Sequence, residues 1–364
     1  MRFPWPQKLL SLAILLASSV APVCGQALEG TPADLTSVPQ TLLPLFHAKE
    51  VVTELQISDD AYDGILPQLR EIDGPWWASR NLPADKHRKI IQEQEKKLVQ
   101  LIESNFSPSS LQRLRQLEIQ AQGYRALVRP DVGRFLKLTA QQLETLTKKF
   151  ETIDSLASKI FSKPGVEDPE AKKAWNEAKS KEPEWAAQLL TSSQKQRLSE
   201  LIGPSFDTQR LERIYPLAPE FTPCESWIGK PTRLQDLKGK VVLVHFYAFQ
   251  CSNCKANFPI YRRWTKELAS KGVEVIGIQT PETPAESKLE NVRDAYNRDD
   301  FAFPVLQDGD RAHWDKWANT MWPTVYVLDK KGFVRFWWQG ELRWQGATVD
   351  EKIEKLVAKL LTEN

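Results

Sequence analysis

The chain has 364 residues, of which 41% are hydrophobic and 26% charged, a composition typical of globular proteins with room for two domains. Its 49 basic and 47 acidic residues give a formal net charge of +2, so no basic surplus indicates nucleic-acid binding. The four histidines are scattered along the chain, which argues against a histidine-rich metal or haem site.

The first residues have the pattern of a secretory signal peptide. A basic start precedes an uncharged apolar stretch over residues 9–20, and small residues follow it. Cleavage after Gly25 fits this pattern, and so does cleavage after Ala27. The apolar stretch is short for a membrane span of about 20 residues, so an uncleaved anchor is the alternative. We therefore expect an exported protein of the periplasm or cell envelope, in contact with the membrane only if the signal stays uncleaved.

A linker and a helical region are expected to follow the signal. Residues 28–50 contain glycine, proline, serine and threonine without periodicity, which predicts a linker. Apolar residues then recur every three or four positions, as in residues 89–102 and 143–161, which predicts amphipathic helices. No strand-like alternation interrupts this pattern. Residues 51–213 are thus predicted to form an all-α domain, whose role the sequence does not indicate.

Two short strings recur within the helical region. Residues 138–142 read L-T-A-Q-Q, and residues 190–194 read L-T-S-S-Q. A threonine followed three positions later by glutamine is also a capping box, which marks the start of a helix. The strings resemble the helix starts of periplasmic LTxxQ-motif proteins, some of which sense envelope stress or act as small chaperones. Plain helix capping is the alternative interpretation.

Strands and helices alternate from residue 214 to residue 364. An apolar run predicts a buried strand, and a helix to about residue 270 should connect it to a second, parallel strand. Two further apolar runs joined by K-K-G predict a hairpin, and an amphipathic helix closes the chain. The predicted strands are at 241–247, 273–279 and 324–329, followed by F-V-R-F-W-W. The fold class expected here is α/β.

Cys251 and Cys254 lie where the first of these strands gives way to the helix. The N-terminus of a helix favours negative charge and lowers the pKa of a thiol, which makes Cys251 the expected nucleophile. Cys254 lies about one turn further along, so it can resolve a mixed disulfide formed by Cys251. This spacing suits thiol–disulfide exchange and needs no cofactor beyond the cysteine pair.

Other roles for the pair are less favourable. A zinc site needs two more ligands, and the candidates Cys224 and His245 form no recognisable spacing, so no metal is expected. A structural disulfide across two residues is geometrically awkward. Covalent haem attachment needs C-x-x-C-H, which is absent. Cys224 is left over, either as a buried thiol or as a partner in an intermolecular disulfide.

Residues from about 215 to 364 resemble a thioredoxin-fold domain of the TlpA/ResA-like group and the thioredoxin-like module of DipZ-type proteins. The matching segments are 218–221, 236–254, 272–279, 303–308 and 322–332. The resemblance implies an α/β fold with Pro259 inside the redox helix. It also implies that Pro323 is a cis-proline facing the two sulfur atoms, with Trp322 beside it, as substrate-binding residues.

The chain departs from this group at two positions. The buried acid that commonly precedes the motif is replaced by His245, and the glutamate that some members place after the second cysteine is replaced by Asn257. His245 is a candidate for proton handling, or else a core histidine. An aromatic rim of Trp322, with Tyr247, Phe249 and Trp264, could bind apolar segments of a client protein. Core packing is the alternative for these rings, and it is the favoured interpretation of Trp264.

The leading hypothesis is an exported thiol–disulfide oxidoreductase. Its partners would be disulfides or dithiols of exported proteins, together with an unidentified redox partner that recycles the cysteine pair. A redoxin-type thiol peroxidase is one alternative, but such enzymes need threonine or serine where this chain has Ala248. A chaperone-like envelope binding protein on a thioredoxin scaffold is the other alternative.

Overall fold

The computed structural model describes residues 38–161, 169–208, 211, 215–222 and 226–363. Internal contacts define two compact units. Of the described residues, those in 38–58 and 95–211 belong to the first unit, and those in 59–94 and from 215 onward belong to the second. The predicted signal peptide, Cys224 and residues 28–37 of the predicted linker lie outside the described residues, so the structure does not bear on them.

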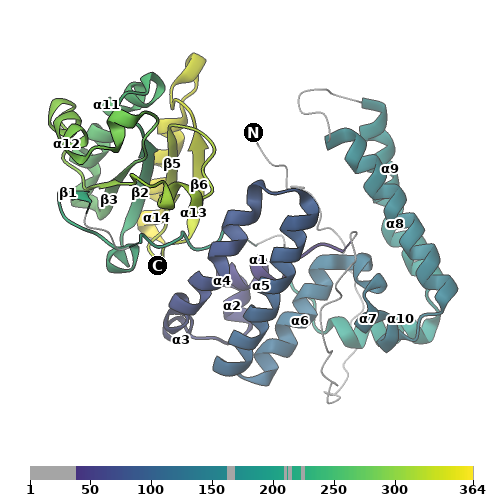
Figure 1. Cartoon of the computed structure of the whole chain (residues 1–364). Coiled ribbons are helices and arrows are strands. Elements are labelled where there is room, and N and C mark those ends of the chain that lie inside the picture. The colour runs from purple at the N-terminus through teal and green to yellow at the C-terminus, as the bar shows by residue number, and fades with distance from the viewer. Residues whose placement is uncertain (1–37, 162–168, 209–210, 212–214, 223–225, 364) are drawn as a thin grey trace. The chain divides into compact units, whose positions relative to one another are not determined.

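The first unit is helical, as the sequence predicts (Figure 1). Its described helices are α1 (Leu42–His47), α2 (Lys49–Glu54), α6 (Pro108–Gln122), α7 (Pro130–Leu136), α8 (Ala140–Phe161), α9 (Pro169–Leu189) and α10 (Ser192–Ile202), with a 3₁₀ segment η2 (Gly123–Val128). Helix α5 (Ala84–Asn105) crosses the boundary between the units. None of the helices in the described part of the chain is long and apolar enough to cross a membrane.

Helices α1 and α2 correct the prediction that residues 28–50 form a linker. Leu42, Leu43 and Phe46 of α1 are fully buried in the first unit. Buried apolar side chains stabilise a short helix that propensity alone would not. The prediction failed because Pro44 and the short length of the segment hide its periodicity.

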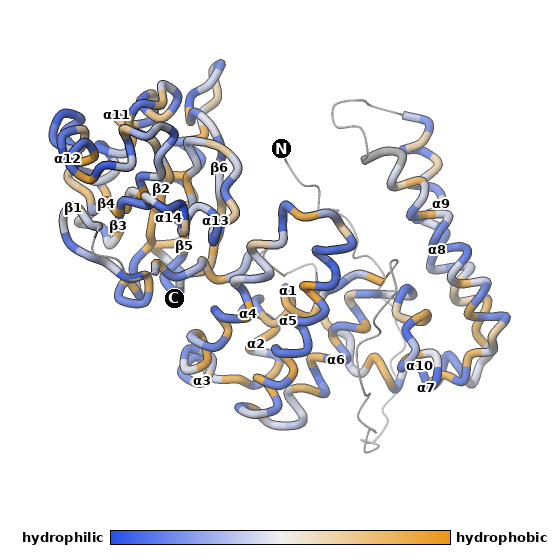
Figure 2. The backbone as a smooth tube through the Cα atoms, in the orientation of Figure 1, coloured by the Kyte–Doolittle hydropathy of each residue, from blue (hydrophilic) through white to orange (hydrophobic). Residues whose placement is uncertain are grey.

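Helices α8 and α9 pack along each other and alternate between polar and apolar positions (Figure 2). Phe150 of α8 is fully buried, and its ring lies 5.2 Å from that of Trp185 in α9. Both residues belong to a cluster that includes Leu127 and Val132 of the neighbouring segments. The pair of helices therefore has an apolar seam of its own.

The two L-T-x-x-Q strings lie against each other. Thr139 and Thr191 accept hydrogen bonds from the backbone N–H groups of Gln142 and Gln194 at 3.1 and 3.3 Å, as capping boxes do. The two glutamine side chains then bond to each other, Nε2 of Gln142 to Oε1 of Gln194 at 2.9 Å and the reverse at 3.1 Å. The strings thus cap α8 and α10 and also join the two helix starts.

A six-stranded mixed sheet forms the centre of the second unit. Its strands are β1 (Trp227–Ile228), β2 (Val241–Tyr247), β3 (Val273–Gln279), β4 (Val305–Gln307), β5 (Thr324–Leu328) and β6 (Val334–Gln339), in the order β1-β4-β3-β2-β5-β6. Strands β2, β3 and β4 are parallel, while β5 and β6 form an antiparallel hairpin. These findings confirm the predicted parallel pair, hairpin and α/β class.

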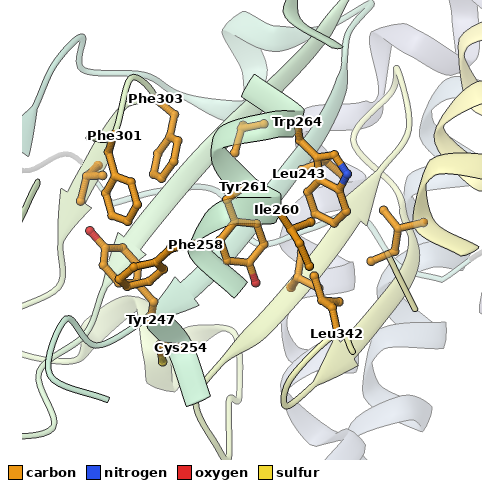
Figure 3. Packing of buried hydrophobic residues seen from close by; sticks show 14 of the residues in the cluster. Leu243, Tyr247, Cys254, Phe258, Ile260, Tyr261, Trp264, Phe301, Phe303 and Leu342 are labelled. Carbon is orange, nitrogen blue, oxygen red and sulfur yellow. The ribbon is translucent and has the colours of Figure 1, made fainter. Parts of the chain in front are cut away.

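Helices cover one face of this sheet. The helix α11 (Ser252–Leu268) and the helix α14 (Val349–Thr362) pack on alternate β2 residues, Leu243 and Tyr247 among them, and α12 (Leu289–Arg298) adds to the same core. Trp264, Tyr261 and Phe258 of α11 point into this core (Figure 3). The burial of these large side chains fixes α11, and with it the redox motif, against the sheet.

The other face of the sheet is covered in part by residues that the sequence assigned to the helical domain. Helix α4 (Leu66–Ala78) places Trp77 in a core with α13 (Ala312–Lys316), and the indole Nε1 donates to the Trp317 carbonyl at 3.1 Å. Arg80 lies over the Trp77 ring at 4.0 Å and donates to Tyr326 of β5 at 3.2 Å. The helices α3 (Asp59–Gly64) and α4 therefore group with the sheet, although both were predicted within 51–213. Helical periodicity shows that a helix has a buried face, but it does not show which part of the fold that face packs against.

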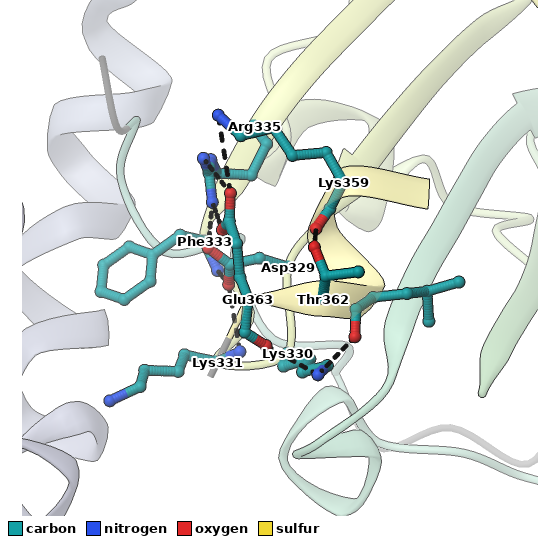
Figure 4. A network of polar contacts seen from close by, with 9 residues as sticks. Asp329, Lys330, Lys331, Phe333, Arg335, Lys359, Thr362 and Glu363 are labelled. Carbon is teal, nitrogen blue, oxygen red and sulfur yellow. Dashed lines mark hydrogen bonds and ion pairs between the residues drawn. The ribbon is translucent and has the colours of Figure 1, made fainter. Parts of the chain in front are cut away.

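The turn between β5 and β6 is joined to the end of α14 by a polar network (Figure 4). Arg335 pairs with Asp329 at 3.3 Å and with Glu363 at 2.6 Å. Lys330 donates to the Leu361 and Glu363 carbonyls. Burial raises the pKa of Asp329, while Arg335 opposes this rise. The network therefore holds the end of the C-terminal helix α14 against the sheet.

Candidate active site

The cysteine pair lies where β2 leads into α11. The strand ends at Tyr247, and Cys251 is the N-cap of the helix, so Cys254 falls within its first turn. Both cysteines are free thiols. Cys251 is partly exposed and Cys254 is fully buried. The structure thus places the two predicted residues together, with one thiol accessible and the other enclosed.

The pKa values of the two thiols move in opposite directions. A hydrogen bond from Cys254 and backbone N–H groups at the start of α11 together lower the pKa of Cys251 to about 7, although partial burial opposes this shift. Burial raises the pKa of Cys254 far above that of an ordinary thiol. At neutral pH, about half of Cys251 is therefore thiolate, whereas Cys254 stays protonated.

Pro323 follows a cis peptide bond from Trp322, as the resemblance implied. Its ring is buried at the start of β5, and its carbonyl accepts a hydrogen bond from Gly340 at 2.8 Å. Met321, just before this bond, is 47% exposed. The cis-proline loop therefore combines a buried turn with an apolar side chain open to solvent.

Trp322 is held in a stack of aromatic and basic side chains. Its ring lies 4.1 Å from that of Trp314, and the Arg311 guanidinium lies over both rings at 5.0 and 5.1 Å. The indole Nε1 donates to the Thr280 carbonyl at 3.2 Å. These contacts hold the ring, which remains partly exposed, next to the cis peptide bond in the sequence.

The predicted aromatic rim is wrong for Tyr247 and Phe249, whereas the core packing favoured for Trp264 is confirmed. Tyr247, Phe249 and Trp264 are buried in the core beneath α11, and Trp264 donates to Glu354 at 2.7 Å. Large rings on the sheet face find more apolar surface there than at a loop edge. Of the four predicted members, Trp322 alone is partly exposed.

Asn257 has a bracing contact at the position where some relatives carry an acid. Its Oδ1 accepts a hydrogen bond from the Leu342 N–H at 2.9 Å, and its Nδ2 donates to the Gly340 carbonyl at 3.3 Å. The side chain thereby joins α11 to the loop that follows β6. A carboxylate could not donate to Gly340, so asparagine suits this contact.

His245 lies in the core under α11. Its ring stacks on that of Tyr261 at 4.0 Å, and both ring nitrogens lack a hydrogen-bond partner. Complete burial lowers the pKa of His245 to about 3. A neutral imidazole this hard to protonate is a poor proton acceptor at neutral pH, which favours the core interpretation of this residue.

The sequence reasoning missed Glu286, which lies under the active-site loop. Its carboxylate is fully buried and accepts hydrogen bonds from the backbone N–H groups of Gln250 at 2.7 Å and Glu282 at 2.7 Å. Thr283 donates its N–H to the same carboxylate at 3.1 Å. The one available signal was T-P-A-E at residues 283–286, which resembles a capping box.

Glu282 was also missed. Its side chain is exposed, and the charge of its carboxylate raises the pKa of both Cys251 and Cys254. Among the described residues, no group of three or more His, Cys, Asp or Glu side chains is arranged to hold a metal ion. The reactive groups that the arrangement brings together are the two thiols of Cys251 and Cys254.

Comparisons with known proteins agree with this geometry. Residues 216–337 match the AhpC/TSA family. The chain is 34% identical over 122 residues to protein DipZ of Mycobacterium tuberculosis, and this covers 32% of the chain and 18% of DipZ. It is 35% identical to the thioredoxin-like protein YneN and 32% identical to the thiol-disulfide oxidoreductase ResA, both of Bacillus subtilis, over 32% of this chain in each case.

Residues 216–337 belong to a thioredoxin-fold domain of the TlpA/ResA-like group. The match covers 66% of YneN and 62% of ResA. A solved thiol:disulfide interchange protein of Chlorobium tepidum is also similar, at 25% identity over 40% of this chain and 95% of that one, with a TM-score of 0.32. The chain spans about a fifth of the length of DipZ, and the match lies in the thioredoxin-fold domain.

Proposed function

We propose that this protein is an exported thiol–disulfide oxidoreductase that exchanges disulfides with protein substrates through Cys251 and Cys254. The observation that carries this proposal is the asymmetry of the two thiols. Cys251 is accessible with a pKa of about 7, whereas burial raises the pKa of Cys254. Thiol–disulfide exchange needs one thiol that attacks from solvent and a second that waits beside it.

In the reductive direction, the Cys251 thiolate attacks one sulfur of a substrate disulfide. A mixed disulfide forms, and the other substrate sulfur leaves as a thiolate that takes a proton from water. Cys254 then loses its proton, attacks Cys251 Sγ and releases the second substrate thiol. The pair is oxidised by two electrons and the substrate disulfide is reduced by two. A redox partner must restore the pair, and every step is reversible.

Substrates are proposed to bind beside the cis-proline. Trp322 and Pro323, joined by the cis peptide bond, are the proposed substrate-binding residues, and Met321 next to them is exposed. The Gly340 N–H bonds to the Pro323 carbonyl at 2.8 Å, which holds the following loop close by. Trp344 in that loop is 58% exposed. Of the three large exposed hydrophobic side chains in the described part of the chain, two therefore lie on loops of this site.

Export is part of the proposal and rests on the signal pattern of the first 27 residues. An oxidising compartment supplies substrates with disulfides and makes a dedicated redox partner necessary. Peroxidase activity is less favourable because Ala248 is buried and has no hydroxyl to position a peroxide. The AhpC/TSA family match does not supply that hydroxyl.

The proposal is tested by trapping substrates. Cys254→Ser leaves the nucleophile without its resolving thiol, so mixed disulfides with exported proteins should accumulate on Cys251. Non-reducing gels of cell-envelope extracts, followed by mass spectrometry, would detect them. Cys251→Ser is the matched control and should trap none. Equal trapping by both variants, or by neither, would contradict the assigned roles.

A further inference from the structure

Resolution of a mixed disulfide requires Cys254 to lose its proton, although burial raises its pKa. The two positions where related domains place an acid do not supply one here. His245 has a pKa of about 3, and Asn257 uses its amide to brace the loop after β6. His245 and Asn257 therefore bring no charge to the two thiols at neutral pH, so a charged group that acts on both belongs to the surrounding loops.

The loop after β3 lies next to the loop that carries Cys251. Strands β2 and β3 are parallel neighbours whose last residues, Tyr247 and Gln279, are paired. The loops that follow the two strands therefore begin at the same edge of the sheet. The Thr280 N–H donates to the Tyr247 carbonyl at 3.0 Å, which continues this pairing into the loops.

The buried Glu286 carboxylate holds the two loops together. It accepts hydrogen bonds from the Gln250 N–H in one loop and the Glu282 N–H in the other, both at 2.7 Å. Thr283 Oγ1 adds a bond to the Gln250 side chain at 2.7 Å. Gln250 precedes Cys251 directly, so this clamp fixes Glu282 at the rim of the cysteine pair.

We infer that Glu282 is a positioning residue of the redox reaction, whose exposed carboxylate acts through its charge on Cys251 and Cys254. This inference rests on the proposed thiol–disulfide exchange and names a residue that sets its energetics. The negative charge disfavours the thiolate and leaves the uncharged disulfide unaffected. It therefore makes the reduced pair less stable and the domain a stronger reductant.

Other charged groups face this site. Glu286 is engaged by three backbone N–H groups. The Arg311 guanidinium lies over Trp322 and reaches the Pro281 carbonyl at 3.5 Å, next to Glu282. Arg311 is thus the nearby cation whose charge opposes that of Glu282. The aromatic stack of Trp314 and Trp322 holds this guanidinium in place.

The experiment compares Glu282→Gln with Glu290→Gln, which removes the same charge from an exposed position at the start of α12. The Cys251 pKa is measured from the pH dependence of alkylation and of thiolate absorbance in the reduced full-length protein. We expect Glu282→Gln to lower this pKa by about half a unit. Because alkylation follows the thiolate fraction, Cys251 should then react about threefold faster at pH 6. High salt should reduce the difference from wild type.

A second readout is the reduction potential, which Glu282→Gln should make less negative. A change in loop conformation alone would not give a salt-dependent shift of the Cys251 pKa. The pKa and the reduction potential together therefore distinguish the loss of the Glu282 charge from a structural change. Equal shifts in Glu282→Gln and Glu290→Gln, or no shift in either, would overturn the inference. The thiol titration does not depend on turnover, so the inference and the proposed function can fail separately.

Discussion

The Glu286 carboxylate accepts a hydrogen bond from the backbone N–H of Gln250 at 2.7 Å. This contact joins a residue after β3 to the residue just before the nucleophile, and it is buried. The position of Cys251 thus depends on a side chain far from it in sequence. The helix α11 supplies the electrostatic environment of the thiol, and Glu286 holds the loop that enters it.

Glu286→Ala should lower the free energy of unfolding by about 1–3 kcal/mol, because the backbone N–H groups that it satisfies lose their acceptor. Urea denaturation of the reduced protein would measure this loss. Glu290→Ala removes an exposed glutamate nearby and should change stability by less than about 0.5 kcal/mol. Equal stability of the two variants would contradict the clamp.

Alkylation of Cys251 should follow its thiolate. Because the Cys251 pKa is lowered to about 7, roughly a tenth of the thiol is ionised one pH unit below this value and roughly nine tenths one unit above it. The rate should therefore rise steeply from pH 6 to pH 8 and then level off. Cys254 should stay unmodified over this range, since burial raises its pKa. A midpoint near that of a free thiol would contradict the assignment.

Much of the site follows from local strings. An apolar strand, a helix start and two cysteines at fixed spacing predicted the position of Cys251, and the resemblance of residues 322–332 to the family implied that Pro323 is cis. Glu282 and Glu286 were not found because their role arises only when β2 and β3 lie side by side. A charged residue in a loop has no local sequence pattern that predicts which groups it will face in the fold.

The domain boundary shows the same limit. The helical pattern of residues 59–94 was correctly recognised, but its buried face packs on the sheet through Trp77. The rings of Tyr247 and Phe249 were expected at the rim and lie in the core instead. Periodicity identifies an apolar face, and the partner of that face is decided by tertiary packing.

Trp344→Ala should weaken the binding of protein substrates. The exposed indole lies on the loop that Asn257 and Pro323 hold beside the cis-proline. We expect KM for a protein disulfide to rise about fivefold, or about 1 kcal/mol, with little change for a small disulfide reagent.

Leu82→Ala provides the control for this prediction. Leu82 is 42% exposed and follows Asn81, whose side chain donates to the Ala318 carbonyl on the other face of the sheet. Its removal should leave both KM values unchanged. Equal effects of the two truncations would show that general surface hydrophobicity, rather than the loop of Trp344, decides substrate affinity.

Gln142 and Gln194 should be energetically coupled. Their side chains exchange hydrogen bonds at 2.9 and 3.1 Å, in addition to capping their own helices. A double-mutant cycle with Gln142→Ala and Gln194→Ala should give a coupling energy of about 0.5–1.5 kcal/mol in urea denaturation. Strictly additive losses would mean that each string acts as an independent helix cap.

A glutathione redox titration of the mature protein tests the central claim most directly. Thiols would be alkylated and counted by mass, in wild type and in Cys224→Ser. We predict one reversible two-electron couple confined to Cys251 and Cys254, unchanged by the Cys224 substitution. A pair that never forms a disulfide, or forms one only irreversibly, would contradict the assignment of this domain as a thiol–disulfide oxidoreductase.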